Sequence, residues 1–76
     1  MVSSAPEHLS TLRKSKLLSQ RDLAKKAGVG VSTVALLEAG RSVPKLVTMR
    51  KICDALGIGD PGKVVEFRRV IRADAN

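Results

Sequence analysis

The chain has 76 residues, enough for one domain, which is expected to span residues 1–76, and too few for a multidomain machine. With 43% hydrophobic and 28% charged residues and no long apolar run, it is neither an intrinsically disordered chain nor a membrane span. A net charge of +7 favours a polyanion, either nucleic acid or an anionic membrane surface. The single aromatic residue, Phe67, cannot supply the stacking surfaces of RNA and single-strand binding modules, so duplex DNA is the expected partner. A basic protein with no polyanionic partner is the alternative.

Residues capable of catalysis or metal binding are sparse. The chain has one Cys, Cys53, and one His, His8, too few for an internal disulfide or a structural zinc site. No Ser/His/Asp set, carboxylate pair or Gly-rich phosphate-binding loop is identifiable. We therefore expect no enzyme activity, no cofactor, no metal and no small-molecule ligand, and a buried, inert Cys53 thiol. The N-terminus lacks a signal-peptide pattern, which makes the cytoplasm the expected location.

Two capping-box patterns mark the first helices of the chain. The pattern at residues 4–7, which includes a proline in the first turn, predicts a helix over about residues 5–16. The pattern at residues 19–22 predicts a second helix that ends at Gly28. A new periodic segment then predicts a third helix that stops at Gly40.

The C-terminal half predicts two more helices. Apolar residues repeat every three to four positions over residues 46–56 and stop at Gly57, which is typical of a helix ended by a C-terminal cap. Asp60 and Pro61 provide a cap and a first-turn proline for a last helix over about residues 61–73. Five helices with short connections and no strand pattern predict a compact all-α fold.

The second and third helices have the spacing of a helix-turn-helix, expected at about residues 19–38. Ala24 provides a small side chain where the two helices cross closely, and Gly28 permits the positive φ of the turn. The apolar residues expected to hold the pair on the core are Leu23, Val34 and Leu37. An ordinary αα-hairpin is the alternative interpretation of this pattern.

A set of motifs over residues 9–58 resembles the lambda-type phage repressor and Cro family, also called the XRE family. The motifs are Leu12-Arg13, Ser19-Gln20-Arg21-Asp22-Leu23-Ala24, Ala27-Gly28-Val29, Ser32-Thr33-Val34, Leu37-Glu38, Gly40-Arg41 with Pro44, and Ile52 with Ala55-Leu56-Gly57-Ile58. The resemblance implies a compact, all-α, five-helix lambda-repressor-like domain. It also implies a homodimer that binds a palindromic operator in double-stranded DNA with its third helix in the major groove.

The resemblance also implies which residues contact DNA. Base contacts are expected at Val31, Ser32, Thr33 and Leu36. Phosphate contacts are expected at Gln20, Arg21, Gly30, Arg41, Lys45 and Arg13, of which Arg21 and Arg13 are expected as basic residues that can flank the same groove and not from the resemblance. Gln20 is further expected to brace the third helix.

The third helix departs from the family pattern in the residues that would read DNA. Gly30 stands where a Ser or Thr cap is usual, and Val31 stands where Gln is frequent. No Arg, Lys, Asn or Gln lies in this helix, so readout is left to the hydroxyls of Ser32 and Thr33, to apolar contacts with thymine methyls, or to DNA shape. Alternatively, Val31 and Leu36 face a protein partner.

The last helix has more apolar residues than one face of a small core needs. This favours a dimer interface formed by Val64, Phe67, Val70 and Ile71. A two-fold dimer would place the two copies of the third helix about 34 Å apart, one turn of B-DNA. A membrane-surface helix is the alternative, with its basic residues at Lys63, Arg68, Arg69 and Arg72.

Glu38, at the end of the third helix, is expected either to pair with Arg13 or Arg50 or to remain exposed with little energetic effect. Taken together, the sequence predicts a sequence-specific DNA-binding transcriptional regulator that represses as a homodimer. A protein-interaction adaptor or an antitoxin on the same scaffold is the alternative function.

Overall fold

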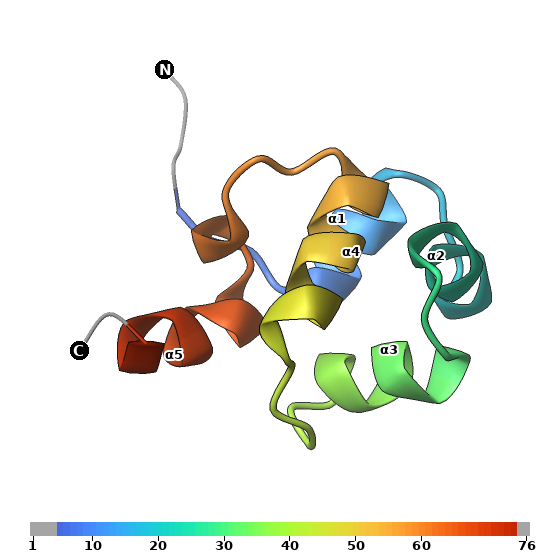
Figure 1. The fold of residues 1–76 in the computed structure, drawn as a ribbon. Coiled ribbons are helices and arrows are strands. Elements are labelled where there is room, and N and C mark those ends of the chain that lie inside the picture. The colour runs from blue at the N-terminus through green and yellow to red at the C-terminus, as the bar shows by residue number, and fades with distance from the viewer. Residues whose placement is uncertain (1–4, 75–76) are drawn as a thin grey trace.

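The computed structural model describes residues 5–74 as a set of helices joined by short turns (Figure 1). The helices of this region are α1 (Leu9–Ser15), α2 (Gln20–Ala27), α3 (Val31–Glu38), α4 (Leu46–Leu56) and α5 (Val65–Asp74), with a 3₁₀ turn, η1, at Pro61–Lys63. The described residues contain no strand. The predicted all-α class with five helices is confirmed.

All five helices contribute to one hydrophobic core. Its largest fully buried side chains are Phe67, Leu9, Leu23, Leu37, Ile52, Leu56, Val34 and Val64, each less than 2% exposed. Burial of each such side chain stabilises the fold by roughly 1.5–3 kcal/mol. The core therefore fixes α2 and α3 relative to α1 and α4.

The start and the end of α2 follow the predicted capping pattern. The Ser19 hydroxyl accepts the Asp22 N–H at 2.9 Å, and the Asp22 carboxylate accepts the Ser19 N–H at 3.1 Å. This second bond is the main reason that the pKa of Asp22 lies below its ordinary value. Gly28 ends the helix at φ 73°, a conformation that glycine adopts without a Cβ clash.

The predicted start of the first helix is wrong. α1 begins at Leu9 rather than near residue 5, and Ser4 of the predicted capping box lies outside the described residues. Glu7 is extended instead, because its N–H donates to the Lys63 carbonyl and its carbonyl accepts the Val65 N–H, both at 2.9 Å. Figure 1 shows the N-terminal segment passing beside the chain that leads into α5.

The last predicted helix is interrupted. The Asp60 carboxylate accepts the Gly62 N–H at 2.9 Å and starts the 3₁₀ turn, as its capping role predicts. Val64 is then extended, with φ −103° and ψ 118°, so that it pairs with the N-terminal segment and buries its side chain completely. α5 begins only after this residue.

Candidate nucleic-acid interface

α2 and α3 form a helix-turn-helix whose inner face is buried. Ala24 is 3% exposed, as expected for a small side chain at a close crossing, and Leu23 and Val34 are fully buried. In the turn, the Val29 N–H donates to the Ala24 carbonyl at 2.9 Å. The predicted roles of these residues and of Gly28 are confirmed, and the opposite face of α3 is left at the surface.

Glu38 connects α3 to α1 and α2. Its carboxylate accepts hydrogen bonds from Arg13 Nε at 2.6 Å, Arg13 Nη2 at 3.1 Å and Gln20 Nε2 at 2.9 Å. Arg13 Nη1 also donates to the carbonyl of Leu18 at 2.8 Å. We refer to Arg13, Gln20 and Glu38 as the Glu38 cluster; it fixes the end of α3 against the start of α2, and the predicted bracing by Gln20 is confirmed.

The negative charge of Glu38 and the positive charge of Arg13 form an ion pair within the protein. Burial raises the pKa of Glu38, but the hydrogen bonds from Arg13 and Gln20 and the nearby positive charges outweigh it, so this pKa lies below its ordinary value. The hydrogen bond to Glu38 raises the pKa of Arg13. Arg13 is only 8% exposed and its guanidinium donates to Glu38 and to the Leu18 carbonyl inside the fold, which leaves little of it at the surface for the phosphate contact expected from the sequence.

The exposed face of α3 is uncharged and combines apolar side chains with hydroxyl groups. Val31 is 44% and Leu36 45% exposed, Ser32 is exposed, and Thr33 is half-buried. The one charged residue of this helix, Glu38, is directed into the Glu38 cluster. At its start, the N-cap Gly30 offers no side-chain cap to the first N–H groups of the helix.

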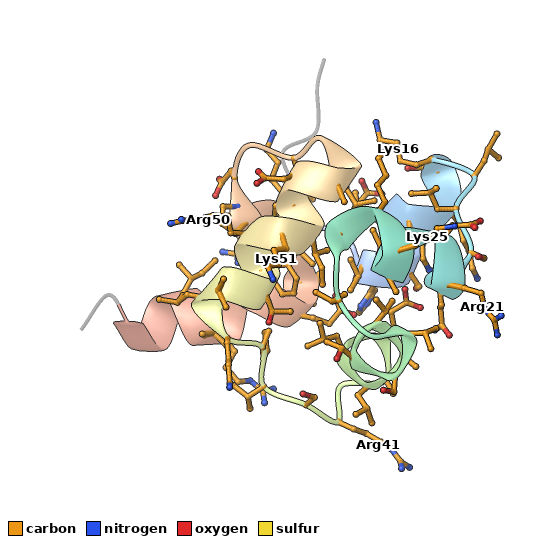
Figure 2. The ribbon with its side chains drawn as sticks, turned by 45° about the vertical axis from the view of Figure 1, so that its right-hand side comes forward. Lys16, Arg21, Lys25, Arg41, Arg50 and Lys51 are labelled. Atoms are coloured by element: carbon orange, nitrogen blue, oxygen red, sulfur yellow. The ribbon has the colours of Figure 1, made fainter. Side chains whose placement is uncertain are left out.

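Exposed basic side chains lie on α2 and on the α3–α4 loop, the segments that flank α3 in the chain. Arg21 and Lys25 of α2 and Arg41 and Lys45 of the α3–α4 loop are exposed. Figure 2 shows Arg21 and Arg41 extending outward on the same side of the molecule, one beside α3 and one below it, whereas Arg50 extends on the opposite side. The structure thus places Arg21 and Arg41, two of the residues predicted to contact phosphates, on the same side of the molecule.

A model of the Cro/C1-type helix-turn-helix family matches residues 9–61, which is more than half of the chain. The chain belongs to this helix-turn-helix family. The family consists of DNA-binding transcription regulators, so its partner class is double-stranded DNA. No curated protein and no solved structure matches the chain.

In this helix-turn-helix protein, two of the residues predicted at a dimer interface are in the core. Val64 and Phe67 are fully buried within one chain, so neither offers a surface to a second subunit. Val70 and Ile71 are half-buried. Sequence reasoning did not single out the most exposed large apolar residues outside α3, which are Leu17 (92%), Val43 (77%), Leu46 (60%) and Val47 (56%).

Leu17 has an unusual backbone conformation that the sequence does not signal. Its φ is 60°, the left-handed region that favours glycine, and the chain has no glycine at this position. Leu17 lies between the end of α1 and Leu18, and the carbonyl of Leu18 accepts a hydrogen bond from Arg13 Nη1. The strain thus lies next to the Glu38 cluster.

The remaining chemistry of the helix-turn-helix protein is limited. Cys53 is buried, as predicted, and burial raises the pKa of its thiol. Within the described part of the chain, no group of His, Cys, Asp and Glu could hold a metal ion. None of the described helices is long and apolar enough to cross a membrane.

Proposed function

We propose that this protein is a sequence-specific transcriptional regulator that represses by occupying promoter DNA with α3 in the major groove. The observation that carries the proposal is the exposed α3 face, with Arg21 and Arg41 extending on the same side of the molecule. An α-helix fits the major groove of B-DNA, and basic side chains beside it reach the phosphates.

The proposed contacts divide into two classes. Arg21, Arg41 and Lys45 neutralise phosphates, and the uncapped start of α3 at Gly30 offers backbone N–H groups to another phosphate. Gln20 uses Nε2 toward Glu38 and remains partly exposed for a phosphate contact. The residues proposed to contact base edges are Val31, Ser32, Thr33 and Leu36.

We further propose that the protein acts as a homodimer on a palindromic site, with an interface that keeps Val70 and Ile71 of the predicted set and omits the buried Val64 and Phe67. The apolar residues Val43, Leu46 and Val47 are exposed near the half-buried Val70 and Ile71 of α5. Leu46 and Ile71 line one surface pocket, and Val43 and Val70 line a second. We refer to these five residues as the α4–α5 surface and propose that a second copy covers them.

Selection of bound duplexes from a random DNA pool at about 150 mM salt tests binding, specificity and symmetry together. A palindromic motif with half-sites about 10 base pairs apart is expected.

The Arg41→Ala variant should bind all duplexes more weakly, with a smaller salt dependence, whereas Ser32→Ala should reduce the preference among sequences. Lys16→Ala is the control for the loss of one positive charge, because Lys16 is exposed and lies at the opposite end of the view from Arg41 (Figure 2). Enrichment of no motif would contradict sequence-specific binding.

A protein-interaction adaptor, including an antitoxin, is the second candidate function. The observation that favours it is the exposure of Val31 and Leu36 on an uncharged face, which also fits an apolar partner surface. Retention of no duplex at any salt concentration would favour this function over DNA binding. A weak salt dependence of partner binding would support an apolar protein interface.

A further inference from the structure

The exposed side chains of α3 lack the groups that distinguish bases by paired hydrogen bonds. Guanine is commonly read by Arg or Lys, and adenine by Asn or Gln, and none of these occurs in α3. The only carboxylate of the helix accepts three hydrogen bonds from Arg13 and Gln20, so it is not free to accept one from cytosine. Hydrogen bonding from α3 is therefore limited to the Ser32 and Thr33 hydroxyls.

Val31 and Leu36 offer apolar contact instead. Each exposes almost half of its surface, and the helical repeat separates them by about 7.5 Å along the axis and roughly 140° around it. They therefore lie near opposite edges of the exposed face, with Ser32 between them. The apolar group that a base presents in the major groove is the C5 methyl of thymine, and 5-methylcytosine has a methyl at the same ring position.

The surroundings of this face favour DNA over a protein as its occupant. Arg21 and Arg41 extend beside and below α3 (Figure 2), Lys25 and Lys45 are exposed on the segments before and after it in the chain, and the face itself adds no negative charge. A polyanion with apolar groups in its groove matches this combination of a neutral face and a basic surround.

We propose that α3 is a reader of C5-methyl groups. Val31 and Leu36 contact pyrimidine methyls in the major groove, so the protein prefers thymine at these positions and accepts 5-methylcytosine better than cytosine. Methylation of cytosine at such a position would strengthen binding. This inference rests on the proposed DNA-binding function.

The test uses a duplex that the wild-type protein enriches from a random pool. The duplex is resynthesised with deoxyuridine in place of thymidine, one position at a time, which removes a methyl and leaves base pairing intact. At two or more positions in each half-site, the Kd is expected to rise about fourfold, the effect of one buried methyl group. At the same positions, 5-methylcytosine is expected to bind about fourfold more tightly than cytosine.

Matched variants assign the effect to α3. In Val31→Ala or Leu36→Ala, the ratio of the uracil and thymine Kd values should fall toward one at the contacted position. In Arg41→Ala, both Kd values should rise while their ratio stays at about fourfold. Ratios of one at every position, with tight binding retained, would overturn methyl reading and leave DNA binding intact. Failure to enrich any duplex would overturn the proposed function, and methyl reading with it.

Discussion

Glu38 is the residue on which the contacts among α1, α2 and α3 converge. Its carboxylate is matched by Arg13 and Gln20, and both members of the ion pair are about nine-tenths buried. A buried charge destabilises the fold unless its oppositely charged partner is also present. Removing one member of a buried ion pair therefore lowers the free energy of unfolding by far more than the intact pair contributes to it.

The first prediction concerns this ion pair. Glu38→Ala should lower the free energy of unfolding by about 3–5 kcal/mol, because it leaves the Arg13 guanidinium buried and unpaired. The double variant Arg13→Met/Glu38→Leu should lose much less, since it leaves no unpaired charge. Urea unfolding followed by circular dichroism measures both. Equal losses in the single and the double variant would contradict the prediction.

The Glu38 cluster also marks a limit of sequence reasoning. The sequence indicated that Glu38 pairs with Arg13 or Arg50 or with neither, because helical periodicity gives the face of a residue but not its neighbours on other helices. The same uncertainty led to the expectation that Arg13 contacts a phosphate. Gln20 was predicted correctly as a brace because the motif that contains it specifies its position relative to α3.

The second prediction concerns pH. The pKa of Glu38 lies below its ordinary value in the folded protein, so between the folded pKa and the unfolded value of about 4.3 the unfolded chain binds more protons. The stabilisation from Glu38 is therefore present above about pH 4.3 and is lost as the pH falls through the folded pKa. Asp22 acts in the same direction.

Urea unfolding between pH 6 and pH 3 checks this sign. The free energy of unfolding should decrease toward acid, and the decrease should be smaller in Arg13→Met/Glu38→Leu. Adding Asp22→Asn should reduce it further. An identical pH profile for the wild type and the double variant would show that Glu38 does not contribute.

The third prediction uses the strained backbone of Leu17. Leu17→Gly should raise the free energy of unfolding by about 0.5–1 kcal/mol, because glycine relieves a left-handed strain of roughly 1–2 kcal/mol and part of the gain is lost to unfolded-chain entropy. Leu17→Ala is the control, since it shortens the same exposed side chain and keeps the strain. Thermal unfolding of the two variants separates these effects. A glycine variant no more stable than the alanine variant would contradict the explanation.

At the scale of elements, the ends of α1 and α5 depend on each other. The Leu9 N–H at the start of α1 donates to Glu66 Oε1 of α5 at 2.8 Å, and the other oxygen of Glu66 lies 3.2 Å from His8 Nδ1. The sequence predicted a local cap at residues 4–7, because a capping box is a short-range pattern. A cap supplied from 57 residues away has no such signature, whereas the local caps of α2 and of η1 were predicted correctly.

The fourth prediction separates this cap from the backbone pairing beside it. Glu66→Ala should lower the free energy of unfolding by about 1 kcal/mol, the usual effect of losing a helix cap. Glu66→Gln keeps an acceptor and should lose less. Glu7→Ala should have no effect, because Glu7 pairs with Lys63 and Val65 through its backbone only. Equal losses at Glu66 and Glu7 would contradict a specific cap.

At the scale of the whole molecule, the composition of a helix does not determine which of its apolar side chains enter the core and which stay exposed. The sequence indicated that the last helix has more apolar residues than one face of a small core needs, and on that basis predicted a dimer interface that included Val64 and Phe67. It could not indicate that the core has room for Val64 and Phe67, because that depends on how the other helices pack. Apart from Leu17 and the exposed face of α3, the exposed large apolar residues belong instead to the α4–α5 surface.

The fifth prediction tests this surface as the dimer interface. Leu46→Glu should shift the protein toward monomer, because it places a charge in the centre of an apolar contact. Leu17→Glu is the control, since Leu17 is an exposed leucine outside the α4–α5 surface. Sedimentation equilibrium gives the mass of each variant. An unchanged mass in folded Leu46→Glu would place the interface elsewhere.

The pairing of Glu7 with Val64, together with the cap on Leu9, has a consequence for the order of folding. α2 packs on α3 and on α4, which follow it in the chain, so these contacts require only short loops to close. The ends of the chain meet only when a loop of nearly 60 residues closes, which carries a larger entropic cost. Partial unfolding that frees α5 also removes the cap of α1, and it leaves the helix-turn-helix assembled on α4.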